Sequence, residues 1–140
     1  MTEFVLDCSV AVAWVFDDQA SDATDALLRA LQEGGRAVVP PLWHLEFGNV
    51  LVQAERRRKL TAAETSQRLA FFADLPIATD TAMDADLRSS IVQLARRTSL
   101  TTYDASYLEL ASRHGLALAT RDKALRRVAG DEAVAVLPGP

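Results

Sequence analysis

The chain has 140 residues, of which 49% are hydrophobic and 24% are charged, values that are ordinary for a compact soluble protein. This length predicts one domain, residues 1–140, with a core that needs no covalent staple. The net charge of −4 argues against a uniformly basic nucleic-acid-binding protein but allows a local basic surface. The single cysteine, Cys8, excludes an internal disulfide and a cysteine-built zinc site.

The sequence gives no sign of membrane insertion or export. No apolar run approaches the ~18–20 residues that cross a bilayer. No charged leader followed by an apolar segment and a cleavage site opens the chain. We therefore expect a soluble, cytoplasmic protein without a membrane partner, and the low cysteine content fits a reducing compartment.

The first expected elements are a buried strand and a helix. Residues 4–6 form a short continuous apolar run, which is typical of a strand buried on both faces of a parallel sheet. Asp7 follows this run, Ser9 is a good helix N-cap, and an apolar helix is expected over residues 10–16. A strand that ends in Asp before a helix places that carboxylate at the functional edge of an open α/β sheet.

Helices and strands are then expected to alternate to the end of the chain. Further helices are predicted over residues 22–33, 43–58, 61–73, 81–98, 101–114 and 122–128. Expected N-caps are Ser21, Thr61 (in a capping box with Glu64), Thr81, and either Thr101 or Thr102. Further strands are predicted over residues 37–39, 75–78, 116–119 and 133–137. In the helix over residues 43–58, the candidate buried positions are Leu42, Leu45, Gly48, Leu51 and Val52. This alternation predicts an α/β fold with a central, mainly parallel sheet flanked by helices.

Four acids carry the main functional signal: Asp7, Glu46, Asp104 and Asp122. Asp7 and Asp122 each follow a predicted strand, Asp104 opens a helix, and Glu46 shares a helix face with Asn49. Carboxylates gathered at one rim repel each other unless a divalent cation neutralises them. Oxygen ligands without cysteine favour Mg²⁺ or Mn²⁺, which can activate water for phosphodiester cleavage.

Each acid also has a structural interpretation. Asp104 and Asp122 would interact favourably with helix dipoles, and Glu46 would suit a surface position. Asp7 is the hardest to explain in this way, because an unpaired charge among apolar residues is costly. Two other functions stay open. One is a phosphatase-like or phosphoacceptor α/β domain using Asp7, although the second acid expected two residues later is replaced by Ser9. The other is a non-catalytic dimer that binds a partner protein.

In order along the chain, these motifs resemble the PIN domain, and in particular the VapC toxins of bacterial toxin–antitoxin pairs. The resemblance spans essentially the whole chain and rests on residues 7–9, Glu46 with Asn49, residues 100–111, and residues 119–122. It implies a PIN-like three-layer fold. It also implies that the metal-binding and catalytic cluster is Asp7, Glu46, Asp104 and Asp122. Supporting polar positions of the family's site fall on Ser9, Asn49 and Thr120.

The resemblance further implies a magnesium- or manganese-dependent endoribonuclease that cleaves a structured RNA, such as transfer RNA, with metal-activated water. It implies a homodimer and inhibition by a cognate VapB-type antitoxin. The antitoxin would insert a C-terminal segment that fills the groove or blocks the metal site. For contact with RNA, electrostatics alone favours the basic residues Arg56, Arg57, Arg58, Lys59 and Arg121.

Overall fold

A five-stranded parallel sheet forms the centre of the molecule, whose structure, a computed structural model, describes residues 2–139. The strand order is β3-β2-β1-β4-β5, and every neighbouring pair is parallel. The strands are β1 (Glu3–Leu6), β2 (Arg36–Val39), β3 (Ile77–Thr79), β4 (Ala117–Ala119) and β5 (Val136–Leu137). The predicted α/β class with a parallel sheet is confirmed.

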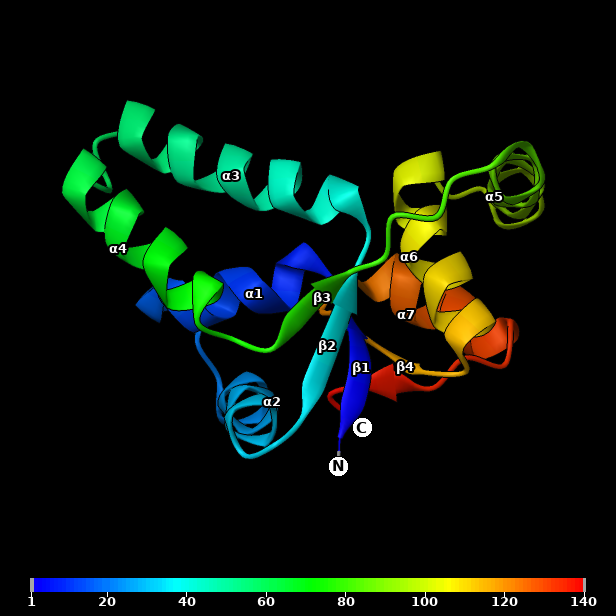
Figure 1. Cartoon of the computed structure of the whole chain (residues 1–140), viewed down its shortest axis with the longest axis horizontal. Helices are drawn as coiled ribbons and strands as arrows, with labels where there is room; N and C mark the ends of the chain where they lie inside the picture. The colour runs from blue at the N-terminus through cyan, green and yellow to red at the C-terminus, as the bar shows by residue number, and fades with distance from the viewer. Residues whose placement is uncertain (1, 140) are drawn as a thin grey trace.

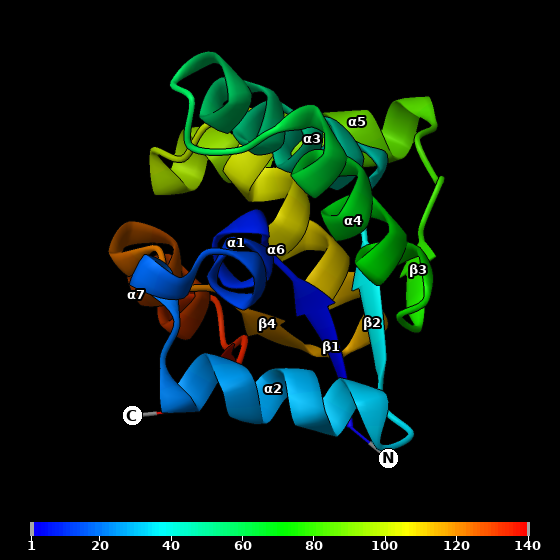
Figure 2. The ribbon, with the colours of Figure 1, turned by 90° about the vertical axis from the view of Figure 1, so that its left-hand side faces the viewer.

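Helices cover both faces of this sheet (Figure 1). They are α1 (Cys8–Val15), α2 (Asp22–Gln32), α3 (Pro41–Arg56), α4 (Ala62–Ala73), α5 (Ala85–Thr98), α6 (Thr102–His114) and α7 (Lys123–Asp131), with a short 3-10 helix η1 (Asp17–Gln19). Figures 1 and 2 show α1, α2 and α4 on one side of the sheet and α5, α6 and α7 on the other, while α3 lies beyond the carboxyl ends of the strands. None of the helices within residues 2–139 has the length and apolar character needed to cross a membrane.

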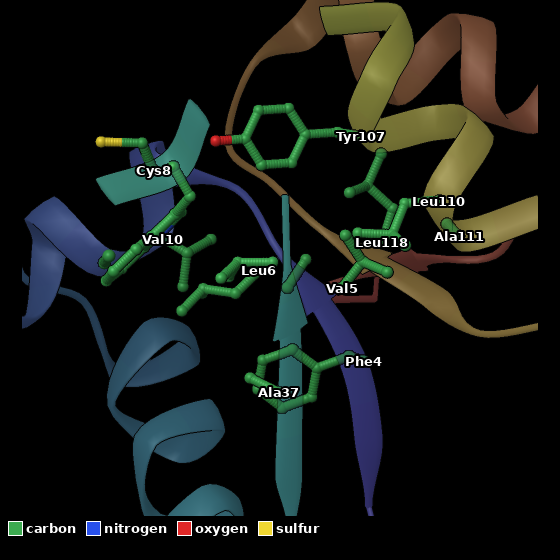
Figure 3. Close-up of a cluster of buried hydrophobic side chains, with 14 of the residues drawn as sticks. Phe4, Val5, Leu6, Cys8, Val10, Ala37, Tyr107, Leu110, Ala111 and Leu118 are labelled. Atoms are coloured by element: carbon green, nitrogen blue, oxygen red, sulfur yellow. The ribbon is translucent and has the colours of Figure 1, made fainter. Parts of the chain in front are cut away.

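The central strand β1 is fully buried, which explains its continuous apolar sequence. Phe4, Val5 and Leu6 are completely inaccessible to solvent, and Val5 pairs with Val38 of β2 on one side and Leu118 of β4 on the other. Figure 3 shows these side chains packed among residues of α1 and α6. Because β1 lies in the middle of the sheet, the residue that follows it emerges at the middle of the carboxyl edge.

Three of the predicted helix caps are confirmed. Ser21, Thr61 and Thr101 precede α2, α4 and α6, and each side chain accepts a hydrogen bond from the backbone N–H three residues later. The Thr61 cap includes the reciprocal contact from Glu64 that the sequence pattern predicted. These caps satisfy backbone donors that have no partner within the helix.

Two predicted caps are wrong. Asp7, not Ser9, precedes α1, and Ser9 lies inside the helix with its hydroxyl bonded elsewhere. Asp84, not Thr81, caps α5, because its carboxylate accepts the N–H of Leu87 at 2.8 Å. The chain between β3 and α5 is therefore longer than predicted. At α5 a carboxylate, a stronger acceptor than a hydroxyl, stood three positions after the predicted cap, whereas Asp7 makes no side-chain capping hydrogen bond.

The outer strands are shorter than predicted. Pairing of β3 with β2 begins at Ile77, after Pro76, so this strand begins two residues later than predicted. The last strand begins at Val136 rather than at residue 133, because Ala133 has a φ of 60°, which is incompatible with an extended strand.

The predicted buried face of α3 is largely wrong. The buried residues of this helix are Trp43, Phe47, Leu51 and Ala54. Leu45 is 73% exposed and Val52 is 39% exposed, although both were predicted to be buried. Leu42 and Gly48 are half-buried, which leaves Leu51 as the one fully correct position. The orientation of α3 is set by its aromatic face, because Phe47 packs against Phe72 of α4 with ring centroids 4.4 Å apart.

A cluster of charged residues joins the end of β3 to the last turn of α6. The Asp80 Oδ2 atom lies 2.6 Å from His114 Nε2 and 3.1 Å from Arg113 Nη1, and Asp80 Oδ1 accepts the Ala82 N–H at 3.0 Å. Burial by itself raises the pKa of Asp80, but these hydrogen bonds outweigh burial and lower the pKa to about 2. The ionised form of Asp80 therefore stabilises the fold.

We expect Asp80→Asn to lower the free energy of unfolding at pH 7 by about 1 kcal/mol, a value typical of solvent-screened ion pairs and hydrogen bonds to charged groups. Because the folded-state pKa is depressed, this contribution is present above about pH 4 and is lost as the pH falls through about 2. Urea unfolding of both proteins at pH 7 and near pH 2 measures it. A difference of the same size at both pH values would contradict the electrostatic origin.

Candidate functional site

The four acids come from four separate elements and lie near one another at the carboxyl edge of the sheet. Asp7 follows β1, Glu46 belongs to α3, Asp104 lies in the first turn of α6, and Asp122 caps α7 after β4. Their proximity affects their pKa values. Burial is the largest cause of the raised pKa of Glu46 and of Asp104. The charges of Asp7 and Asp104 raise the pKa of Glu46 further, and those of Asp7 and Asp122 raise the pKa of Asp104 further. Asp7, Asp104 and Asp122 therefore each act electrostatically on at least one of the other acids.

Asp7 is a buried carboxylate held from one side only. Its side chain is buried, and its Oδ2 atom accepts hydrogen bonds from Ser9 Oγ and Thr120 Oγ1, both at 2.7 Å. Its Oδ1 atom accepts no hydrogen bond from residues 2–139. The two hydroxyls offset part of the cost of burying the charge. Because Thr120 follows β4, the neighbour of β1, the parallel pairing of these strands brings the two residues together.

Glu46 reaches the site from α3 and is held by a tyrosine. Burial, followed by the charges of Asp7 and Asp104, raises the pKa of Glu46, while a hydrogen bond from Tyr107 opposes this rise. The Tyr107 hydroxyl donates this bond to Glu46 Oε1. Figure 3 shows the Tyr107 ring extending from α6 with its hydroxyl oxygen toward the side where Cys8 lies. The raised pKa of the phenol, caused first by burial, keeps it protonated.

Sequence reasoning did not find Tyr107. The available signal was its spacing, since it lies three residues after Asp104 and therefore on the same face of α6. Its burial and its partner on α3, 61 residues earlier in the chain, depend on tertiary packing. Cys8, in contrast, behaves as a buried small residue. Burial, with the charges of Asp7 and Glu46, raises the pKa of its thiol to about 12, so it is a poor nucleophile.

Asp104 and Asp122 differ in how they are bound. Asp122 is exposed, and its Oδ1 atom accepts the N–H of Leu125 at 2.8 Å, so the capping role considered for it is present. Asp104 is half-buried, and Thr101 bonds only its backbone N–H. The Asp104 carboxylate accepts no hydrogen bond within residues 2–139. A helix cap therefore accounts for one side chain and leaves the other without a structural partner.

The other predicted residues fall into two places. Arg121 is held against α1 and η1, since its guanidinium donates to Ser9 O and to Gln19 Oε1, both at 2.7 Å. Asn49 is exposed on α3 and, with Arg57 and Lys59, lines a groove of about 300 Å³ between α3 and the end of α1. Arg56 and Arg58 are exposed at the carboxyl end of α3. Four of the predicted basic residues therefore lie together at the carboxyl end of α3, and Gln19, the partner of Arg121, lines the same groove as Arg57 and Lys59.

The donor set matches the chemistry of a hard divalent cation. It consists of carboxylate oxygens, and within residues 2–139 no lysine or arginine forms an ion pair with any of the four acids. Burial, followed by the charges of neighbouring acids, raises the pKa values of Glu46 and Asp104, and a cation would offset both effects. Among the same residues, however, no three His, Cys, Asp or Glu side chains lie close enough to form a complete metal site. The carboxylates would have to draw closer to an ion.

Comparison with known proteins places this geometry in a family. A family model described as the PIN domain matches residues 4–131. PAE2754 from Pyrobaculum aerophilum is similar in structure, with a TM-score of 0.71 and 22% sequence identity over 96% of this chain and 83% of that chain. VapBC2 from Rickettsia felis, bound to a DNA fragment from its promoter, gives a TM-score of 0.68 and 10% identity over 96% of this chain and 97% of that chain.

A third similar structure is FitAcB from Neisseria gonorrhoeae, with a TM-score of 0.63 and 19% identity over 95% of each chain. No curated protein sequence matches the chain. At these identities the structural likeness establishes the fold, and the family model, which covers most of the sequence, establishes the relationship. The chain belongs to the PIN domain family.

Proposed function

We propose that this PIN domain is a VapC-like endoribonuclease toxin that uses Mg²⁺ or Mn²⁺ to cleave a structured RNA such as transfer RNA. The observation that carries the proposal is the set of four carboxylates that come from four elements, influence one another's charge and have no cationic partner in residues 2–139. A fold gains nothing from collecting such repulsive charges, whereas a metal-dependent phosphodiesterase requires them.

In this proposal each acid has a role that follows from its environment. Asp7, Asp104 and Asp122 would hold the ion, and Asp7 is already oriented for this because only its Oδ1 atom is free. Glu46 would ligate the ion or orient the attacking water. Its raised pKa makes it a better proton acceptor than an ordinary carboxylate. When bound, the ion would supply charge neutralisation and would lower the pKa of water.

The same comparison supports the proposed protein partners. The similar structures include VapBC2, FitAcB and a toxin–antitoxin complex from Klebsiella pneumoniae, so we propose that a VapB-type antitoxin inhibits this chain and that the toxin forms a homodimer. The groove lined by Asn49, Arg57 and Lys59 is a suitable place for an acidic partner or for an RNA backbone. Light scattering of the purified toxin, alone and with the antitoxin, tests both assemblies.

Metal dependence tests the proposed function directly. We expect purified, antitoxin-free protein to cut total transfer RNA into discrete fragments with Mg²⁺ or Mn²⁺ and to lose this activity in EDTA. We also expect either ion to raise the melting temperature, because it would offset the burial and the repulsion that together raise the pKa values of Glu46 and Asp104. Both effects should weaken as the pH falls, since protonated carboxyls bind metal poorly.

The outcomes separate the hypotheses. Fragments that form equally well in EDTA would contradict a metal-dependent mechanism. A folded protein that binds Mn²⁺ without cutting transfer RNA would restrict the proposal to another RNA. A protein that neither binds the ion nor cleaves RNA, but forms a dimer and binds its partner, would support the non-catalytic hypothesis.

A further inference from the structure

The hydroxyl of Tyr107 is a polar group fixed inside the core at the centre of the site. Tyr107 has no exposed surface, and its ring packs among the apolar side chains of α6 and the sheet (Figure 3). A buried phenol needs a hydrogen-bond partner, and this one donates to Glu46 Oε1 on α3. The bond therefore connects the helix that carries Asp104 to the helix that carries Glu46.

This hydrogen bond limits where the Glu46 carboxylate can point. A glutamate side chain has several rotatable bonds, and one that is half-buried near two other acids is driven toward solvent by repulsion. The phenol holds one oxygen in place. The second oxygen, Oε2, accepts no hydrogen bond from residues 2–139.

Asp7 is held in the same way. Two hydroxyls bind its Oδ2 atom and leave Oδ1 free. Two carboxylates from different elements thus each have one oxygen fixed by protein hydroxyls and one oxygen available. Hydrogen bonds that orient metal-ligating carboxylates commonly have this arrangement.

We propose that Tyr107 is a positioning residue that fixes the Glu46 carboxylate so that its Oε2 atom is presented to the divalent ion. The role rests on the proposed metal-dependent function and extends it to a residue that contacts neither the ion nor the RNA. The competing explanation is that the hydroxyl serves only to satisfy a buried polar group, with no consequence for metal binding.

The test is calorimetric titration of antitoxin-free protein with Mn²⁺, which reports binding independently of RNA cleavage. We expect Tyr107→Phe, which keeps the ring and removes the hydroxyl, to weaken Mn²⁺ binding about tenfold, as is typical when a group that orients a ligand is removed. The matched control is Tyr103→Phe on the same helix. The Tyr103 side chain is 62% exposed, and its hydroxyl makes no hydrogen bond within residues 2–139, so its removal should leave binding unchanged.

A double-mutant cycle shows whether the hydroxyl acts through Glu46. In a Glu46→Ala background, Tyr107→Phe should cause no further loss of Mn²⁺ affinity. A further tenfold loss in that background would overturn the role. Wild-type affinity in Tyr107→Phe, with circular dichroism showing a native fold, would overturn it as well and leave the proposed function intact. If the wild-type protein itself bound no Mn²⁺, the proposed function would fail together with this role.

Discussion

Asp7→Asn should abolish metal-dependent cleavage of transfer RNA while the protein stays folded. The amide keeps an oxygen that can accept the hydrogen bonds of Ser9 and Thr120, but it replaces the free Oδ1 atom and removes the charge. A bound ion contributes several kcal/mol to transition-state stabilisation, so its loss should slow cleavage by roughly a thousandfold or more. Rates measured with wild-type and variant protein in Mg²⁺ and Mn²⁺ check this.

The stability of the same variant provides a second measurement. Removing the Asp7 charge relieves Glu46 and Asp104, whose raised pKa values mean that their ionised forms destabilise the fold at neutral pH. The hydrogen bonds from Ser9 and Thr120 also become weaker, because their acceptor is no longer charged, and this acts in the opposite direction. We therefore expect the metal-free melting temperature to stay near that of the wild type, and the stabilisation by Mg²⁺ to disappear.

Two further variants make the result specific. Asp104→Asn should lose cleavage to a similar extent, because its carboxylate oxygens, like Asp7 Oδ1, accept no hydrogen bond within residues 2–139. Asp131→Asn is the matched control, since Asp131 is an exposed carboxylate at the end of α7 that forms no ion pair among the described residues. If both Asp7→Asn and Asp104→Asn cleaved transfer RNA at the wild-type rate, the assignment of these acids to the catalytic site would be contradicted. Loss of cleavage with retained antitoxin binding would exclude a purely protein-binding role.

Phe47→Ala should cause the largest loss of stability among single substitutions in α3. Phe47 is 2% exposed, and its ring lies 4.4 Å from that of Phe72 and 5.3 Å from that of Trp43. Removing a buried phenylalanine typically costs about 3–5 kcal/mol, through lost burial and the cavity that remains. That is a large part of the 5–15 kcal/mol that stabilises an ordinary domain. Urea unfolding measures the difference.

The neighbouring residue Leu45 is the control for this prediction. Leu45 precedes Glu46 in the chain, as Phe47 follows it, but its side chain is 73% exposed. Leu45→Ala should therefore change the free energy of unfolding by less than about 0.5 kcal/mol. Because Phe47 also anchors the turn that carries Glu46, we expect Phe47→Ala to weaken Mn²⁺ binding, whereas Leu45→Ala should not. A loss below about 1 kcal/mol in Phe47→Ala would show that the aromatic face does not fix α3.

Local sequence was sufficient for the architecture of this protein. The apolar run of β1, the alternation of strands and helices, and the caps at Ser21, Thr61 and Thr101 depend on contacts within a few residues. Hydrophobic periodicity and short-range hydrogen bonding report such contacts directly. Asp7, Asp104 and Asp122 could also be found in this way, because a carboxylate at the end of a buried strand or in the first turn of a helix is visible in the sequence; Glu46, inside α3, has no such signal.

Only the tertiary structure decided which face of α3 is buried and which atoms form hydrogen bonds with the acids. The burial of Phe47 rather than Leu45 depends on how α3 packs against α4, and both residues are apolar in the sequence. The Thr120 hydroxyl on Asp7 and the Tyr107 phenol on Glu46 come from residues 113 and 61 positions away. Such contacts are set by the register of parallel strands and by helix packing, in which each residue's partner is chosen by the whole core and not by its neighbours in the chain.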